Sequence, residues 1–133
     1  MKNNEGKDTL KTVLVVEDEP TITSVCQRVL EGQGFKVEIA SNGKQAQEMV
    51  KANRYSHLLV DIRTPTMDGK EFYSWLKDNY PKTAGHVVFM TGDAMGGDTQ
   101  LFLAETGQPF IWKPFTPSDL KALIKRHFNA GAS

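Results

Sequence analysis

Five short runs of apolar, often β-branched residues recur along the chain, each separated from the next by a longer and more polar segment. The runs occupy residues 12–16, 35–39, 57–62, 86–90 and 110–112. Continuous apolar runs of this length are typical of parallel strands that are covered by helices on both faces. The alternation therefore predicts an α/β domain built on a five-stranded parallel sheet with right-handed crossovers.

The segments between the runs carry the signals of five helices. In the first, which follows Pro20, apolar residues recur with helical spacing at positions 22, 25, 29 and 30. The second begins after Asn42, a favourable N-cap, and the third ends before Pro81. The fourth ends near Gly107. The last has the clearest start, because Thr116 suits the N-cap position and is followed by a proline and then an acid in the first turn.

Length and composition fit a single domain. We expect it to span residues 11–129, with a flexible lead-in at 1–10 and a short tail at 130–133. Basic and acidic side chains balance at 16 each, which removes any whole-chain argument for binding nucleic acid or an anionic membrane. No apolar stretch is long enough to span a bilayer, and the single cysteine, Cys26, cannot form an internal disulfide. A cytoplasmic setting is therefore predicted.

Polar residues with reactive side chains stand at or just after the ends of four of the five predicted strands. They are Glu17, Asp18 and Glu19 after the first, Asp61 in the third, Thr91 and Asp93 after the fourth, and Lys113 after the fifth. In open α/β sheets, ligands bind outside the carboxyl ends of the strands. The sequence therefore predicts a polar site at this edge of the sheet.

The charges expected at this edge point to a metal-assisted reaction. Three carboxylates, those of Glu17, Asp18 and Asp61, cannot all stay ionised at close range without compensation. Lys113 would offset one of them and a divalent cation the other two, and an all-oxygen site suits Mg²⁺. A carboxylate beside such a cation can attack phosphorus, and Mg²⁺, Lys113 and the Thr91 hydroxyl would then neutralise the phosphoryl oxygens.

Four sequence blocks resemble the receiver domains of the response-regulator family. They are VVEDEP at 15–20, VDIRTPTMDG at 60–69, FMTGD at 89–93 and FIWKPF at 110–115. Each block is weak alone, but all four stand in the family's order at the ends of the predicted strands, and the resemblance runs from about residue 12 to 128. It implies the flavodoxin-like receiver fold, with strand order 2-1-3-4-5.

The resemblance also implies a role for individual residues. Asp61 becomes the phosphoacceptor, with Thr91 and Lys113 as its catalytic partners. Glu17, Asp18 and Asp61, together with the backbone carbonyl of Arg63, become the Mg²⁺ site. Asp18 is the expected direct ligand, whereas Glu17 stands where the family more often has Asp, so its contact with the metal is expected to run through water.

Further roles concern switching and the lifetime of the phosphorylated state. Thr91 and Phe110 are implied as the switch pair, with Phe110 in place of the family's frequent tyrosine. Arg63 and Asp93 stand where receivers vary and phosphoryl lifetime is tuned, and an Arg–Asp pair there would gate water. The bond before Pro114 is expected to be cis. Trp112 is expected simply to pack on the sheet.

The implied partner is a histidine kinase or a histidine phosphotransfer domain. Direct nucleic-acid binding and membrane insertion by this segment are not expected, and a homodimer through the fourth helix, fifth strand and fifth helix stays open. The stretch MTGDAMGGD and the following FLAETG are similar to C-terminal receivers of hybrid sensor histidine kinases. We favour that context over a stand-alone response regulator. The domain itself would self-phosphorylate and autodephosphorylate, whereas kinase activity would belong to the parent protein.

Three other functions compete with this interpretation. A haloacid-dehalogenase-like phosphatase also joins Asp, Thr, Lys and Mg²⁺, but it needs a carboxylate as general acid/base two residues after the nucleophile, where this chain has Arg63. A flavodoxin-like binding module would need a Ser/Thr/Gly-rich loop after the first strand, where this chain has three acids. The complete set of acids, threonine and lysine argues against a degenerate receiver.

Overall fold

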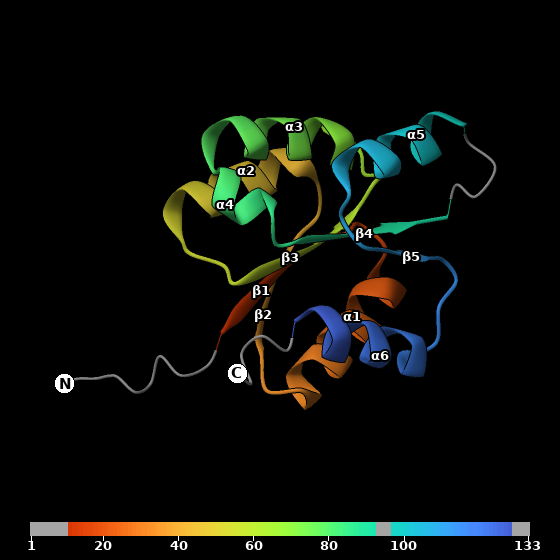
Figure 1. Ribbon diagram of the computed structural model, residues 1–133. Coiled ribbons are helices and arrows are strands. Elements are labelled where there is room, and N and C mark those ends of the chain that lie inside the picture. The colour runs from red at the N-terminus through yellow and green to blue at the C-terminus, as the bar shows by residue number, and fades with distance from the viewer. Residues whose placement is uncertain (1–10, 93–96, 129–133) are drawn as a thin grey trace.

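A parallel sheet runs through the middle of the molecule (Figure 1). The chain is described here from a computed structural model that covers residues 11–92 and 97–128; the predicted lead-in at 1–10 and tail at 130–133 lie outside these residues. The strands are β1 (Thr12–Val16), β2 (Lys36–Ala40), β3 (His57–Asp61), β4 (Val87–Thr91) and β5 (Phe110–Trp112). Their order is β2-β1-β3-β4-β5, which confirms the predicted topology.

Helices cover both faces of the sheet (Figure 1). They are α1 (Pro20–Gly32), α2 (Gly43–Ala52), α3 (Gly69–Asn79), α4 (Pro81–Ala84), α5 (Gly97–Thr106) and α6 (Pro117–His127). The described residues thus form six helices where five were predicted. The additional one, α4, is a single turn that starts at Pro81 and buries Ala84, so it is too short to show a helical period. The predicted fourth and fifth helices correspond to α5 and α6.

The sheet separates two hydrophobic cores. Because successive side chains of a strand point to opposite faces, Val13 and Val15 pack toward α1 and α6, whereas Leu14 and Val16 pack toward α2 and α3. All four are 0% exposed, which explains why the strands read as continuous apolar runs. Cys26 is buried in the core on the α1 and α6 side, with its Sγ 3.9 Å from Met90 Sδ.

Three strands begin or end at other residues than predicted, and the later starts of β2 and β4 have local causes. β2 begins at residue 36 because the Phe35 N–H donates to Leu30 O at 3.1 Å, as part of the exit from α1. β4 begins at residue 87 because the His86 N–H donates to Thr83 O at 2.9 Å and so belongs to the turn of α4. β3 ends at Asp61 and β4 ends at Thr91, so both side chains stand at the carboxyl edge of the sheet.

Side-chain caps set where the helices after β2, β3 and β5 begin. Asn42 accepts from the Gln45 N–H at 2.8 Å, which confirms the predicted cap of α2. Thr116 forms a capping box with Asp119, as the start signal of α6 indicated. Asp68 forms a second capping box with Glu71 at the start of α3. Among the described residues, no helix has the length and apolar character that a membrane crossing requires.

Candidate functional site

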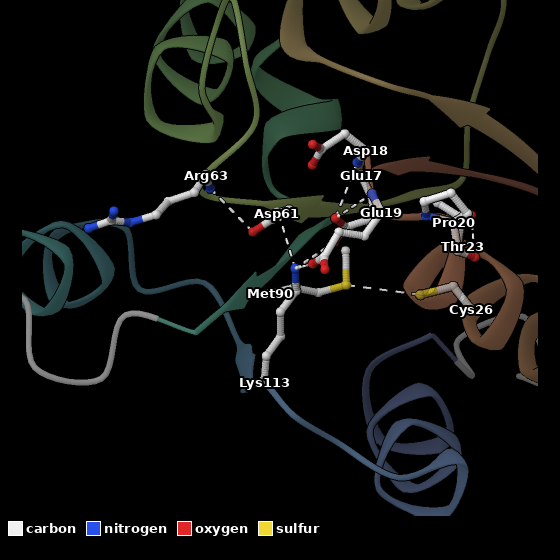
Figure 2. A network of polar contacts seen from close by, with 10 residues as sticks. All are labelled: Glu17, Asp18, Glu19, Pro20, Thr23, Cys26, Asp61, Arg63, Met90 and Lys113. Carbon is white, nitrogen blue, oxygen red and sulfur yellow. Dashed lines mark hydrogen bonds and ion pairs between the residues drawn. The ribbon is translucent and has the colours of Figure 1, made fainter.

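The carboxyl ends of β1, β3 and β5 bring acids and a lysine together (Figure 2). Glu17, Asp18 and Asp61 each place a carboxylate oxygen so that the three atoms lie within 4.8 Å of one another. Glu17 is 1% exposed and Asp61 is 4% exposed, whereas Asp18 is open to solvent. The three predicted metal-ligating side chains therefore do converge, and two of them are desolvated.

Lys113 extends its ammonium group into this acidic cluster. Its Nζ lies 2.7 Å from Glu17 Oε1, 3.1 Å from Asp61 Oδ2 and 3.4 Å from Glu19 Oε1. The Lys113 N–H donates to Thr91 O at 2.7 Å, which fixes the loop after β5 beside the end of β4. The bond between Lys113 and Pro114 is cis, as predicted.

One carboxylate oxygen of Glu17 has a structural role. Its Oε2 accepts from the N–H groups of Asp18 and Glu19, both at 3.1 Å, and so orders the loop that leads into α1 (Figure 2). Its Oε1 is buried and lies 2.7 Å from Lys113 Nζ, which also lies 3.1 Å from Asp61 Oδ2. One ammonium group shared between two buried carboxylates leaves negative charge that an added cation would neutralise.

The pKa values of the cluster reflect the burial of its charged groups and their contacts with one another. Burial raises the pKa of Glu17 to about 7, even though Lys113 opposes this rise. Burial likewise raises the pKa of Asp61 against the influence of Lys113. Burial alone would lower the pKa of Lys113, but its hydrogen bonds and charge interactions with Glu17 and Asp61 outweigh that effect and raise it. Three carboxylates that share one ammonium group fit a divalent cation bound by oxygen ligands.

The loop after β3 holds Asp61 by close backbone packing. Asp61 Oδ1 accepts from the Arg63 N–H at 3.2 Å, and the Gly69 N–H donates to Ile62 O at 2.8 Å. A Cβ at Gly69 would lie 2.6 Å from Asp61 O and 2.8 Å from Ile62 Cα. Only glycine therefore fits at this position. No local sequence signal indicates this role of Gly69, because it depends on a tertiary contact.

A cavity of about 450 Å³ opens beside the acidic cluster. It is lined by side chains and backbone from four strand ends, namely Asp18, Glu19, Asp61, Arg63, Gly92 and Lys113. Glu19 occupies the N-cap position of α1 but makes no side-chain cap bond, and its carboxylate lies 3.4 Å from Lys113 Nζ. The cavity gives a small anionic group access to the Asp61 carboxylate.

The remaining predicted residues are Thr91, Asp93, Phe110 and Trp112. Thr91 is 1% exposed at the end of β4, next to the strand that carries Asp61. Asp93 lies outside the described residues, so its pairing with Arg63 stays a prediction. Phe110 begins β5, two residues before Trp112, and both side chains are 39% exposed, with ring centroids 5.3 Å apart. Trp112 therefore packs edge-on against Phe110 at the molecular surface.

The fold and the site together define a doubly wound α/β domain with acids, a hydroxyl and a lysine at the carboxyl edge of its sheet. The chain belongs to the response regulator receiver domain family, whose model matches residues 13–125. Among curated relatives, the response regulator Rre1 of Synechocystis sp. is 33% identical over 116 residues, which cover 86% of this chain and 50% of that protein. The chain thus spans about half the length of this relative.

Solved receiver structures agree with this assignment. The receiver of a signal transduction histidine kinase from Syntrophus aciditrophicus is 28% identical, with a TM-score of 0.79 and coverage of 90% of this chain and 91% of that one. The receiver of sensor histidine kinase PA1611 from Pseudomonas aeruginosa is 25% identical, with a TM-score of 0.77 and coverage of 90% and 98%. That structure contains a magnesium ion coordinated in its active-site cleft.

Proposed function

We propose that this domain accepts a phosphoryl group on Asp61 from a phosphohistidine, in a reaction that requires Mg²⁺. The observation that carries this proposal is the position of the Asp61 carboxylate, which is buried, lies 3.1 Å from Lys113 Nζ and shares a cluster with Glu17 and Asp18. A structural ion pair would need one acid for one lysine. The surplus of acids is instead typical of a metal-assisted site.

We propose that Asp18 and Asp61, with the backbone carbonyl of Arg63, bind the metal directly, and that Glu17 does so through water. The buried Oε1 of Glu17 and the solvent-open carboxylate of Asp18 support this division. The bound ion would supply positive charge to a phosphoryl oxygen. The magnesium-containing receiver from Pseudomonas aeruginosa is a precedent within the family.

In the proposed transfer, an Asp61 oxygen forms a bond to phosphorus while the bond from phosphorus to the donor's imidazole nitrogen breaks. The donor leaves with the electron pair of that bond and takes up a proton as neutral histidine. Lys113 keeps Asp61 ionised before the reaction and binds a phosphoryl oxygen after it. The Thr91 hydroxyl binds a second oxygen from the neighbouring strand.

We further propose that this capture of the phosphoryl group by Thr91 changes the surface of β5 through Phe110. A partner, or a second copy of this chain, would then recognise the face made by α5, β5 and α6. Such a switch works only if the partner binds one of the two conformations more tightly. The exposure of Phe110 and Trp112 on this face supports the proposal.

We also propose that the domain works in the cytoplasm as the receiver of a hybrid sensor histidine kinase. The likeness to two receivers that belong to histidine kinases supports this context, although the curated relative Rre1 is a response regulator. The stand-alone response regulator remains the alternative. The native reading frame upstream of Met1 would decide, because a hybrid kinase requires a kinase core encoded there.

Labelling with radioactive acetyl phosphate tests the acceptor assignment. The wild-type domain should take up hydroxylamine-sensitive label with Mg²⁺ and none with excess EDTA. Asp61→Asn should abolish the label, since the amide is not a nucleophile of this kind. Asp78→Asn, on the exposed side of α3, is the matched control and should label normally. Wild-type labelling of the Asp61→Asn variant would refute the proposal.

A further inference from the structure

Two adjoining cavities lie at the amino ends of β3 and β4, away from the carboxyl-edge site. The larger, of about 660 Å³, runs between the end of α2 and α4. The smaller, of about 260 Å³, continues from it toward β1. Tyr55, Lys82 and Thr83 line both cavities, so the two form one continuous groove, here called the amino-edge groove.

The amino-edge groove is basic. Within the residues that the structure describes, its lining contains no Asp or Glu but three lysines, one arginine and two histidines, namely Lys11, Lys51, Lys82, Arg54, His57 and His86. Two acids lie close by. Glu48 pairs with Lys51 at 3.3 Å, and Glu38 accepts from the Tyr55 hydroxyl at 2.6 Å. At least three cations, on Lys11, Arg54 and Lys82, therefore remain to face the groove.

The positive charge of the groove contributes to a lowered histidine pKa in the neighbouring core. Burial is the main cause that lowers the pKa of His57 to about 4, and the charges of His86 and Lys11 lower it further. His57 cannot ionise readily to add to this charge, because its ring is 5% exposed and stacks on Phe128 with centroids 4.3 Å apart. The positive charge of the groove therefore comes from its other basic side chains and not from His57.

Two tyrosines give the groove a partly apolar wall. Tyr55 and Tyr80 are half-buried and line the larger cavity. The bond to Glu38 fixes Tyr55, and Trp75 packs beside Tyr80 with ring centroids 5.5 Å apart. A rigid aromatic wall beside several cations is suited to a flat organic group that carries phosphate.

We propose that the amino-edge groove binds a small phosphorylated molecule with a flat organic group, of which a nucleotide is the simplest. Phosphate oxygens would lie against Arg54 and Lys82, and the organic group against Tyr55 and Tyr80. The volume of the groove is in the range of small-molecule sites. This site is independent of the proposed phosphoacceptor chemistry and needs no metal.

The groove and the phosphoacceptor site lie at opposite ends of the same two strands. Tyr55 stands two residues before β3, which ends at Asp61, and His86 directly precedes β4, which ends at Thr91. With a rise of about 3.3 Å per residue, the two sites are about 17–20 Å apart. A ligand in the groove would therefore leave the acidic cluster uncovered.

Titration of the wild-type domain with ATP in EDTA, followed by amide NMR shifts, tests the proposal. Shifts should gather at residues 51–56 and 80–86 and spare residues 17–19. The double variant R54Q/K82Q should weaken binding at least about tenfold, because both charge-assisted hydrogen bonds to phosphate are lost. The matched control K77Q/K121Q removes two exposed lysines that line neither cavity and should change affinity less than about twofold.

Separate titrations with inorganic phosphate and with adenosine identify which part of the ligand is recognised. Phosphate should bind more weakly than ATP at the same residues, and adenosine more weakly still. The proposal is overturned if the control double variant loses as much affinity as R54Q/K82Q, if the shifts lie elsewhere, or if adenosine binds as tightly as ATP. Asp61→Asn should bind ATP like the wild type, so failure of the acceptor assignment would not affect this result.

Discussion

Replacement of Lys113 by methionine should destabilise the metal-free domain by about 3 kcal/mol at neutral pH. Methionine keeps much of the aliphatic stem but leaves Glu17 and Asp61 facing each other without a cation. At an effective dielectric constant of about 20, contacts of 2.7 Å and 3.1 Å contribute about 5 to 6 kcal/mol of attraction each. Dehydration of the three groups cancels much of this, and loss of one partner from a buried pair costs about 3–5 kcal/mol. The lower end applies because the Lys113 side chain is 14% exposed.

Urea unfolding in EDTA at pH 7.5 measures this loss. With an m-value of about 2 kcal/mol per molar, the unfolding midpoint of Lys113→Met should fall by about 1.5 M. Lys51→Met is the matched control, because its ion pair with Glu48 has a similar length of 3.3 Å but is exposed. That variant should lose less than about 1 kcal/mol.

Two further measurements separate lost charge from lost packing. Added Mg²⁺ should stabilise Lys113→Met more than the wild type, because the ion replaces the missing positive charge. The double variant E17Q/K113M should recover part of the stability, because one buried carboxylate is then neutral. If Lys113→Met unfolds within 1 kcal/mol of the wild type in EDTA, or if Mg²⁺ helps both equally, the charge imbalance inferred for this site is wrong.

Two more changes test the backbone of the site and the distant core. Gly69→Ala should destabilise the domain by about 2 kcal/mol and slow phosphorylation, because its methyl group would clash with Asp61 O and Ile62 Cα. The control is Gly32→Ala, which has open space around it and should be neutral or slightly stabilising. Urea unfolding measures both stabilities. His57, whose pKa falls from 6.5 to about 4, should contribute about 3 kcal/mol of stability that is present above pH 6.5 and lost as the pH falls toward 4. Urea unfolding of the wild type and of His57→Phe across this range should show the steeper loss in the wild type, and parallel curves would contradict the assignment.

Much of the fold could be predicted because burial on both faces imposes an apolar run on each strand. Val13 to Val16 show this directly, since alternate residues enter two different cores. The convergence of Glu17, Asp18, Asp61 and Lys113 followed from a second rule, that the ends of parallel strands meet at one edge. Strand order, by contrast, came from family resemblance, because no local pattern encodes which strands are neighbours.

The missed features depend on contacts between distant residues. The Phe35 backbone was assigned to a strand because its side chain is apolar, yet its N–H completes the exit from α1. Trp112 was expected to pack on the sheet, but β5 is an edge strand and leaves this ring at the surface beside Phe110. The need for glycine at position 69 arises from the carbonyl of Asp61, eight positions earlier, which no helix-start signal reveals.

Because of the position of Glu17, we expect Mg²⁺ to have different effects on the stability and on the phosphorylation rate of a variant without Lys113. One of its oxygens orders the start of α1, which leaves the other to compete with Asp61 for the ammonium group of Lys113. A single ammonium cannot neutralise both, so Lys113 is shared before the reaction and would be released toward a phosphoryl group once another cation enters beside Asp18. Magnesium should consequently restore the stability of Lys113→Met without restoring its rate of phosphorylation. Stability needs only positive charge at the cluster. Phosphoryl transfer also needs the Lys113 ammonium group, which donates a hydrogen bond to an oxygen of the transferred phosphoryl group.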